Sequence, residues 1–422
     1  MTVLFVVPYA PNLIRVRPYN LIRSLLRRGH RIVVATLWTN EREREDLEAL
    51  ARFGADVRAH YLPAWRSIVN CVEGFIGGDP LQVRYSWSAA LLREILELAP
   101  QADVVHVEHL RGARFGLAAL AAQADDPSAT PVVWDAVDCI THLFEQAAQK
   151  RPDFVGRLIN QLELPRTRRF EGASAGRFDR VLVTSSVDRE AFLRLAGDRH
   201  DDQAESRLAV LTNGVDLDYF TPDPGQARDA DMLVFSGKMS YHANESAALH
   251  LLGEIMPRIW ARRPSTRLQI VGKDPSERLR AALARHASRA SLTGTVLDLR
   301  PFLRGAAAAV VPLVYGTGCQ NKVLEAMACA TPVVATSQAV SSLRVLPGRD
   351  VFVADAPDVF ADAVLELLDA PARQREVGEA GHRYVQAHHR WDDVAGQLES
   401  VYLELAGRRG ALVRRDGRRR SA

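Results

Sequence analysis

Short runs of apolar, mostly β-branched residues alternate along the chain with longer amphipathic stretches. In the first half, these runs predict buried strands at residues 3–7, 31–36, 103–107, 131–134, 180–184 and 210–211. Helices are expected at residues 19–28, closed by Gly29, and at 186–197, with Ser185 or Ser186 as the N-cap. This alternation is typical of a parallel sheet with crossover helices, and therefore of an α/β fold.

The same alternation restarts after a segment rich in Pro, Gly and Asp, TPDPGQARDAD at residues 221–231, which is the predicted linker. Strands are then expected at residues 232–236, 268–271, near 291, 309–312 and 332–336. Helices are expected at residues 244–261, 276–287, 299–308 and 321–328. The pattern predicts two successive α/β domains, 1–222 and 223–390. Residues 408–422 are basic and almost without apolar side chains, which predicts a disordered tail.

Composition narrows the class of protein. A chain of 422 residues is long enough for two domains, and its charged and apolar fractions are those of a globular protein. A net charge of only +3 gives no sign of nucleic-acid binding. The four cysteines lack metal-ligand spacing, no apolar run reaches about 18 residues, and the amino terminus has no basic leader. We expect a cytoplasmic protein.

The most informative stretch is YGTGCQNKVLEAMACATPVVAT, residues 315–336. It is not a P-loop, because Lys322 is followed by Val323, and it is not a dinucleotide fingerprint, because Asn321 replaces the third glycine. A glycine turn before a helix still offers backbone N–H groups and the positive end of the helix dipole to an anion. Glu325, one turn further on, can accept hydrogen bonds from two neighbouring hydroxyls. A phosphate beside a diol predicts a nucleotide sugar.

Three motifs carry a resemblance to a known family: LTNGVDLDYFTP at residues 211–222, KVLEAMACATPVVAT at 322–336, and the closing HRYVQAHHRWDDVAGQLESVYLEL. With them the chain resembles the retaining glycosyltransferases of family four. That family has the GT-B fold, in which two Rossmann-like domains face each other across a cleft. The resemblance implies an acceptor-binding domain at 1–222, a nucleotide-sugar-binding domain at 223–390 and a crossover helix at 391–407. FSGKMSYHAN, LTGTVLDLRPFL and GTGCQNKVLEAMA are similar to bacterial sugar transferases encoded with exopolysaccharide and exosortase systems.

The resemblance also implies roles for single residues. Glu325 would bind the ribose of the donor, and backbone near Val296 would bind the base. Gly237 and Lys238 would hold the diphosphate, with Lys322 as a second cation. The pyrophosphate loop would consist of Gly318, Cys319, Gln320 and Asn321. Lys238, Asp135 and Asp138 are the predicted catalytic residues.

The sequence departs from the family pattern at three positions. Thr317 stands where the family has the first glutamate of its E-x7-E motif, so Gln320 or Asn321 would have to replace it. Asn244 stands at the second basic position, a charge that Lys322 is expected to supply. Val137 stands where the family has a histidine.

Simpler interpretations stay open for the same residues. Lys322 and Glu325 are three apart on one helix and could form a surface ion pair. Lys238 could be a solvated turn residue, and Asp135 and Asp138 could be helix caps or turn residues.

The cluster HVEH at residues 106–109 suggests a metal site. In a strand, however, His106 and Glu108 share one face and His109 points away, and no third ligand is expected nearby. We therefore predict no metal.

The expected function is transfer of a sugar, with retention, from a nucleotide-diphosphate sugar to a glycan or lipid-linked acceptor, without cofactor or metal. Arginines in the first domain, together with Trp65, Phe75, Tyr85 and Trp87, predict peripheral contact with the inner face of a membrane. A solvated basic surface is the alternative. Two other classes also remain open, a non-catalytic GT-B partner subunit and a nucleotide-sugar 2-epimerase of the same fold.

Overall fold

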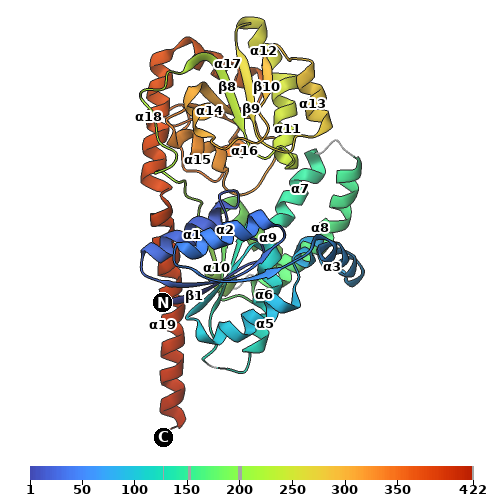
Figure 1. Ribbon diagram of the computed structural model, residues 1–422, viewed down its shortest axis with the longest axis vertical. Helices are drawn as coiled ribbons and strands as arrows, with labels where there is room; N and C mark the ends of the chain where they lie inside the picture. The colour runs from blue at the N-terminus through green and yellow to red at the C-terminus, as the bar shows by residue number, and fades with distance from the viewer. Residues whose placement is uncertain (127, 151–153, 198–201, 421–422) are drawn as a thin grey trace. The chain divides into compact units, whose positions relative to one another are not determined.

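The computed structural model describes residues 1–126, 128–150, 154–197 and 202–420 (Figure 1). The chain divides into two compact units, which we call the first unit (Met1–Thr212 with Trp391–Ala422) and the second unit (Asn213–Arg390). The second unit thus begins at Asn213, ahead of the boundary at residue 222 that the sequence suggested. The reason is that Val215 packs into the core of the second unit, and its N–H donates to the carbonyl of His389 at 2.7 Å.

The first unit contains a parallel sheet in the order β3-β2-β1-β4-β5-β6-β7. All six predicted strands of this half are present, and β3 was missed. Its residues are mostly half-exposed or exposed, so this edge strand lacks a continuous apolar run. The strands are β1 Thr2–Val7, β2 Arg31–Trp38, β3 Asp56–Tyr61, β4 Val104–Glu108, β5 Val132–Val137, β6 Arg180–Val183 and β7 Leu208–Val210.

Helices cover both faces of this sheet (Figure 1). The predicted cap of α9 is confirmed, because the hydroxyl of Ser185 accepts a hydrogen bond from the N–H of Asp188 at 3.0 Å. The helices are α1 Val16–Arg27, α2 Glu41–Arg52, α3 Ala64–Gly77, α4 Leu81–Tyr85, α5 Ala89–Leu98, η1 Ala99–Gln101, α6 His109–Ala122, α7 Ile140–Lys150, α8 Phe154–Ala175, α9 Ser186–Ala196, α10 Asp202–Arg207 and α19 Trp391–Arg420.

Helix α19 buries Val394, Leu398, Tyr402 and Leu405, a stripe of period three to four, in the same core as α1 and β1. The helix then continues to Arg420, where the sequence predicted a disordered tail over residues 408–422. That prediction rested on the lack of apolar side chains that could pack against the rest of the protein. Arginine, however, is a good helix former, and Arg408 pairs with Glu404 one turn earlier.

The second unit contains a parallel sheet in the order β10-β9-β8-β11-β12-β13. Its strands are β8 Asp229–Ser236, β9 Arg267–Val271, β10 Ala290–Leu292, β11 Ala306–Val311, β12 Val333–Ala335 and β13 Phe352–Val353. Its helices are α11 His242–His250, the π-helical turn η3 Leu251–Ile255, α12 Met256–Arg262, α13 Glu277–Ala284, α14 Arg300–Gly305, α15 Asn321–Ala328, α16 Ser337–Val340, α17 Pro357–Asp369 and α18 Pro371–His388.

The predicted helix at 321–328 matches α15, whereas the predicted helix at 299–308 was wrong at its end. Residues 306–308 are alanines, which favour helices in isolation. Here they form the start of β11, a fully buried strand between β8 and β12. Tertiary pairing at the centre of the sheet overrides the local preference.

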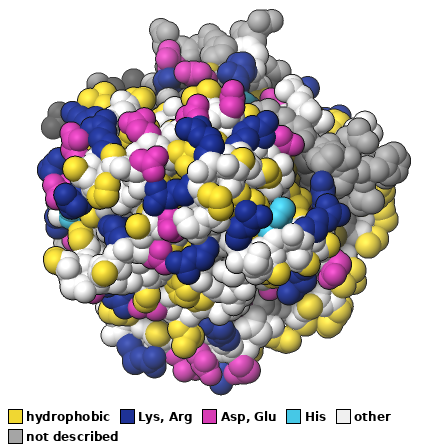
Figure 2. All heavy atoms as spheres, turned by 90° about the horizontal axis from the view of Figure 1, so that it is seen from above, with side chains coloured by type: hydrophobic (Ala, Val, Ile, Leu, Met, Phe, Trp, Pro, Cys, Tyr) yellow, Lys and Arg dark blue, Asp and Glu magenta, His cyan; other side chains and the backbone are white. Residues whose placement is uncertain are grey.

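Both sheets reverse their strand order once. The reversal lies between β1 and β4 in the first unit and between β8 and β11 in the second. In open parallel sheets, ligands bind beyond the carboxyl ends of the strands at such a point. Among the described helices, none has the length and hydropathy needed to span a membrane. On the face drawn in Figure 2, acidic and basic side chains are interspersed, in keeping with the small net charge.

Candidate functional site

The glycine that follows β8 lets three segments of the second unit meet at the reversal of the sheet. Gly237 has φ +153°, and a Cβ at this position would lie 2.8 Å from the Nδ2 atom of Asn244 and 3.4 Å from the Cε atom of Lys322. A larger residue would not fit. Lys238, the next residue, is exposed. The structure therefore brings Lys322 against the loop that carries Lys238.

The loop after β11 is held by a polar side chain at its own end and by one from α16. The side-chain amide of Gln320 donates to the carbonyl of Thr317 at 2.9 Å, and that of Gln338 donates to the carbonyl of Gly316 at 2.9 Å. Gly318 has φ +70°, which favours glycine. Helix α15 follows, and no side chain caps it. The N–H groups at the start of this helix that no side chain caps are suited to an anion.

Lys322 and Glu325 are both partly buried on α15. Burial lowers the pKa of Lys322 to about 8, against the opposing effect of Glu325. Burial likewise raises the pKa of Glu325 to about 7, opposed by Lys322. Lys322 donates to the Oε1 atom of Gln320 at 3.1 Å. Within the described part of the chain, no ion pair of 4.0 Å or less joins Lys322 to Glu325, so the surface-pair interpretation lacks its contact.

Asn321 is positioned by a residue far away in the sequence. The side-chain amide of Asn213 donates to the Oδ1 atom of Asn321 at 3.0 Å, and the carbonyl of Asn213 lies 2.7 Å from the Nδ1 atom of His389. Asn213 belongs to the motif LTNGVDLDYFTP. Sequence reasoning used this motif for recognition only and missed its contact with the loop.

Val296 lies on the loop after β10, on the same edge of the sheet as Lys238. Gly294 in this loop forms a backbone bridge with Gly272 after β9. A Cβ on Gly272 would lie only 1.8 Å from the carbonyl oxygen of Gly237. The loops after β8, β9 and β10 are therefore in contact, although Val296 itself lies two strands away from β8.

Two of the departures from the family pattern fall on buried oxygen atoms. The hydroxyl of Thr317 and the Oδ1 atom of Asn244 have no hydrogen-bond partner. The Nδ2 atom of Asn244 donates to the carbonyl of Lys238 at 3.0 Å, so this residue shapes the loop and supplies no charge. Lys322 is the nearby cation.

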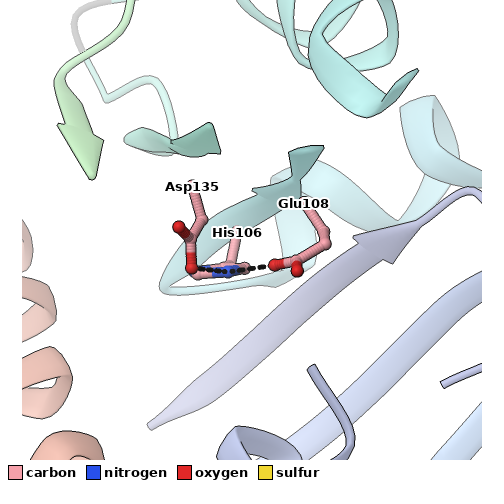
Figure 3. Close-up of side chains that lie close together, drawn as sticks. All are labelled: His106, Glu108 and Asp135. Atoms are coloured by element: carbon pink, nitrogen blue, oxygen red, sulfur yellow. Dashed lines mark ion pairs between the residues drawn. The ribbon is translucent and has the colours of Figure 1, made fainter. Parts of the chain in front are cut away.

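In the first unit, His106 and Glu108 of β4 lie beside Asp135 of β5 (Figure 3). The Nε2 atom of His106 lies 3.5 Å from Asp135 and 3.6 Å from Glu108. The expectation that no third ligand would lie near His106 and Glu108 was wrong. Glu108 and Asp135 are register partners on adjacent strands, so their side chains share one face of the sheet.

This cluster is a buried ion network. Arg17 donates to both oxygens of Asp135, at 2.8 and 3.0 Å, and the hydroxyl of Tyr402 lies 2.8 Å from the Nδ1 atom of His106. Burial lowers the pKa of His106, but the carboxylates of Asp135 and Glu108 outweigh it, and the pKa lies above its usual value. With His106 protonated and Glu108 ionised, two cations would balance two anions; burial and the nearby Asp135 raise the pKa of Glu108 and oppose its ionisation.

Arg17 is relevant to two predictions for this cluster, the absence of a metal ion and the catalytic role of Asp135. Its guanidinium occupies both oxygens of Asp135 and adds a positive charge, which disfavours a metal ion at this position. Asp135 itself is completely buried. As it stands, it can act on a substrate only by positioning other groups.

Asp138 is the more accessible of the two predicted aspartates. It is partly exposed and follows β5, where Thr184 donates to it at 3.3 Å. Burial, with the nearby Asp188, raises the pKa of Asp138 to about 8. It is not the cap of α7, because the N–H groups of Ile140 and Thr141 donate to Glu171 at 2.9 Å.

The backbone beside Asp138 is strained. Val137 has φ +68°, and His109, the first residue of α6 directly after the neighbouring strand β4, has φ +61°. A β-branched residue rarely adopts this conformation, and such strain gathers at functional sites. Val137 lies at the carboxyl edge of the sheet, at the position where the family that the sequence resembles has a histidine.

Comparisons with known proteins agree with this architecture. Residues 15–219 match the family described as Glycosyltransferase Family 4, and residues 230–370 match Glycosyl transferases group 1. The fold is similar to that of HepE from Anabaena in complex with UDP, at 13% identity over 95% of this chain and 99% of that chain, with a TM-score of 0.65. It is also similar to sucrose-phosphate synthase of Thermosynechococcus elongatus, at 17% identity over 96% and 99%, with a TM-score of 0.67.

The chain has the GT-B fold. The predicted α/β class with two Rossmann-like parallel sheets is therefore confirmed. Among curated proteins, this GT-B chain is 29% identical over 244 residues to D-inositol 3-phosphate glycosyltransferase 2 of Catenulispora acidiphila, covering 53% of the chain and 56% of that protein. It is 28% identical over 214 residues to phosphatidyl-myo-inositol mannosyltransferase of Mycobacterium tuberculosis, covering 48% and 55%. The chain thus spans about half the length of the curated relatives it matches.

Proposed function

We propose that this GT-B chain is a glycosyltransferase that takes its sugar from a nucleotide-diphosphate donor and transfers it with retention. The observation that carries the proposal is the edge of the second unit where the uncapped start of α15 meets Gly237. There, a partly buried lysine and a partly buried glutamate, Lys322 and Glu325, lie without an ion pair of 4.0 Å or less between them. Such groups are costly unless a ligand engages them.

On the donor side, the diphosphate binds the N–H groups of α15, with Lys322 and Lys238 as cations. Glu325 accepts hydrogen bonds from the two hydroxyls of the ribose, and backbone near Val296 binds the base. As the glycosidic bond breaks, negative charge grows on the departing diphosphate, and the lysines with the helix dipole stabilise it. This scheme needs no metal. The complex of HepE with UDP supports a nucleotide ligand for the fold.

On the acceptor side, we assign the first unit. Asp138, at the carboxyl edge of its sheet, takes the proton of the acceptor hydroxyl in its carboxylate form, while the hydroxyl oxygen bonds to the sugar and the diphosphate leaves. Its pKa of about 8 suits proton transfer near neutrality. Asp135 holds the site through its buried network with Arg17 and His106. The acceptor in this proposal is a glycan or a lipid-linked precursor. The name of one relative, phosphatidyl-myo-inositol mannosyltransferase, supports the lipid-linked acceptor.

A thermal-shift screen against a panel of nucleotide sugars tests the donor assignment. One donor should raise the melting temperature of the wild type, and Glu325→Ala should abolish that rise while keeping the fold. Loss of hydrogen bonds to a charged group costs about 3 kcal/mol or more, roughly a hundredfold in affinity. Glu366→Ala, an exposed glutamate on α17, is the matched control. An equal rise for Glu325→Ala would refute the ribose assignment.

Turnover without acceptor separates the three candidate functions. A transferase hydrolyses its donor slowly, a 2-epimerase releases an isomeric nucleotide sugar, and a non-catalytic subunit leaves a bound donor unchanged. We expect slow hydrolysis. An isomer, or binding without any turnover, would contradict the proposal.

A further inference from the structure

Helix α3 turns its polar side toward the protein and its apolar side outward, the reverse of an ordinary surface helix. Its polar and small residues face the protein: Ser67 and Asn70 are 2% and 0% exposed, and Gly74 packs against the side chain of Arg84 on α4. The side-chain amide of Asn70 donates to the carbonyl of Trp87 at 2.9 Å. The helix is thus fixed to the first unit through its polar side.

The outward side of α3 is apolar. The exposed residues recur at the helical spacing of three and four, so they form a single stripe. In Figure 1, α3 lies at the margin of the first unit. The stripe consists of Trp65, Ile68, Val69, Val72, Phe75 and Ile76, with exposed fractions from 37% to 82%.

The size of this stripe bears on what covers it. Scaling these exposed fractions by the areas of such side chains gives roughly 600 Å², the upper end for the largest apolar patch of a typical monomer. A stable dimer buries about 800 Å² on each partner. The stripe alone is too small for that, whereas a helix lying in a lipid interface needs only its one apolar face.

The charged groups around α3 also favour a lipid surface as the partner of the stripe. Arginine side chains lie over aromatic rings beside the stripe, Arg166 over Phe75 at 4.3 Å and Arg111 over Tyr85 at 5.0 Å. Five arginines on or beside α3 and α4 stand against three carboxylates; four of the five pair with those carboxylates, and the excess is two positive charges. The two sets are Arg66, Arg84, Arg111, Arg114 and Arg166, and Glu73, Asp79 and Glu163. An excess of arginine with tryptophan beside an apolar stripe fits an anionic bilayer surface.

We propose that α3 docks on a phospholipid bilayer, with its stripe in the interface and the surrounding arginines at anionic headgroups. The proposal does not depend on the sugar-transfer activity. It narrows the membrane contact that the sequence suggested for Trp65, Phe75, Tyr85 and Trp87 to α3, which carries the first two. Trp87 is not part of the surface, since its ring stacks on Phe115 at 5.1 Å inside the unit.

Cosedimentation of the full chain with vesicles tests the proposal. The wild type should sediment with vesicles of equal phosphatidylglycerol and phosphatidylcholine. The double variant Ile68→Glu/Ile76→Glu should lose at least tenfold in the bound fraction. Leu403→Glu, at an exposed apolar position of α19, is the matched control and should bind like the wild type. Circular dichroism and size-exclusion chromatography check that each variant is folded and monomeric.

Tryptophan fluorescence gives a second, local measurement. Of the six tryptophans, Trp65 is the exposed one, so the vesicles should shift the emission of the wild type to the blue, and Trp65→Phe should remove the shift. Equal vesicle binding by the wild type and the double variant would overturn the proposal. A wild type that does not bind the vesicles would also overturn it. So would a wild type that forms a dimer when the double variant is a monomer.

Discussion

The affinity of the second unit for its donor should depend on pH through two residues of α15. Glu325 has a pKa of about 7 and Lys322 a pKa of about 8, both because of burial. The proposed complex needs Glu325 as a carboxylate, to accept from the ribose, and Lys322 as a cation, to meet the diphosphate. Affinity should therefore peak between about pH 7 and 8 and fall on both sides.

The size of the effect follows from these values. Below the pKa of Glu325, each pH unit lowers the carboxylate fraction tenfold, about 1.4 kcal/mol in binding. At pH 5 the donor should bind roughly a hundredfold more weakly than at the optimum, and at pH 9 roughly tenfold more weakly. Without donor, the ionisation of Glu325 has the opposite effect: it lowers the stability of the fold, whereas in the complex it raises the affinity for the donor. Its folded pKa exceeds the unfolded 4.5, so the folded state holds the extra proton and loses stability as pH rises from 4.5 to 7.

Isothermal titration between pH 5 and 9, with the donor that gives the largest thermal shift, measures both limbs. Glu325→Gln should bind weakly and lose the acid limb, because glutamine does not titrate. Lys322→Arg should lose the alkaline limb, because arginine stays charged. A wild-type affinity that is constant over this range, or an acid limb that survives in Glu325→Gln, would refute the assignment of these residues to the donor.

Three further predictions concern the cations, the absence of a metal and the fold. Replacing Lys238 and Lys322 by alanine together should be strongly non-additive in kcat/KM if both clamp one diphosphate, whereas wild-type kcat in Lys322→Ala would remove that lysine from the site. Turnover should survive EDTA; a complete loss that Mg²⁺ reverses would count against a metal-free site. Glu171→Ala should lower the free energy of unfolding of the first unit by about 2–4 kcal/mol in urea. It leaves the N–H groups of Ile140 and Thr141 without their acceptor, and an unchanged urea midpoint would contradict that role.

Local patterns predicted most of the described strands, but they missed β13 and most helices of the first unit, α2 to α8 among them. The predicted strands are present because buried parallel strands consist of continuous apolar runs, and α15 was located to the residue. The failures have physical causes. Strand β3 lies at an edge and lacks such a run, the alanines at 306–308 follow the sheet rather than their helix preference, and α3 carries its apolar side outward.

The candidate site divides in the same way. The glycine turn, Lys322 and Glu325 are contiguous, so the sequence alone could place them together on one helix. The partners of Asp135 could not be found in this way, because Arg17, His106 and Tyr402 come from distant segments that only the strand order brings together. A register argument across β4 and β5 would have paired Asp135 with Glu108, but adjacency of these strands is not visible in the sequence.

The central claim is that the chain breaks the glycosidic bond of a nucleotide sugar with the groups of α15. Proton NMR of the full chain with the donor chosen by thermal shift, without acceptor, follows this bond directly. The account predicts slow release of nucleoside diphosphate and of free sugar that first appears in the anomeric configuration of the donor. It also predicts that Glu325→Ala abolishes the release while Glu366→Ala keeps it. Release of the opposite anomer, an isomeric nucleotide sugar, or equal rates in both variants would contradict it.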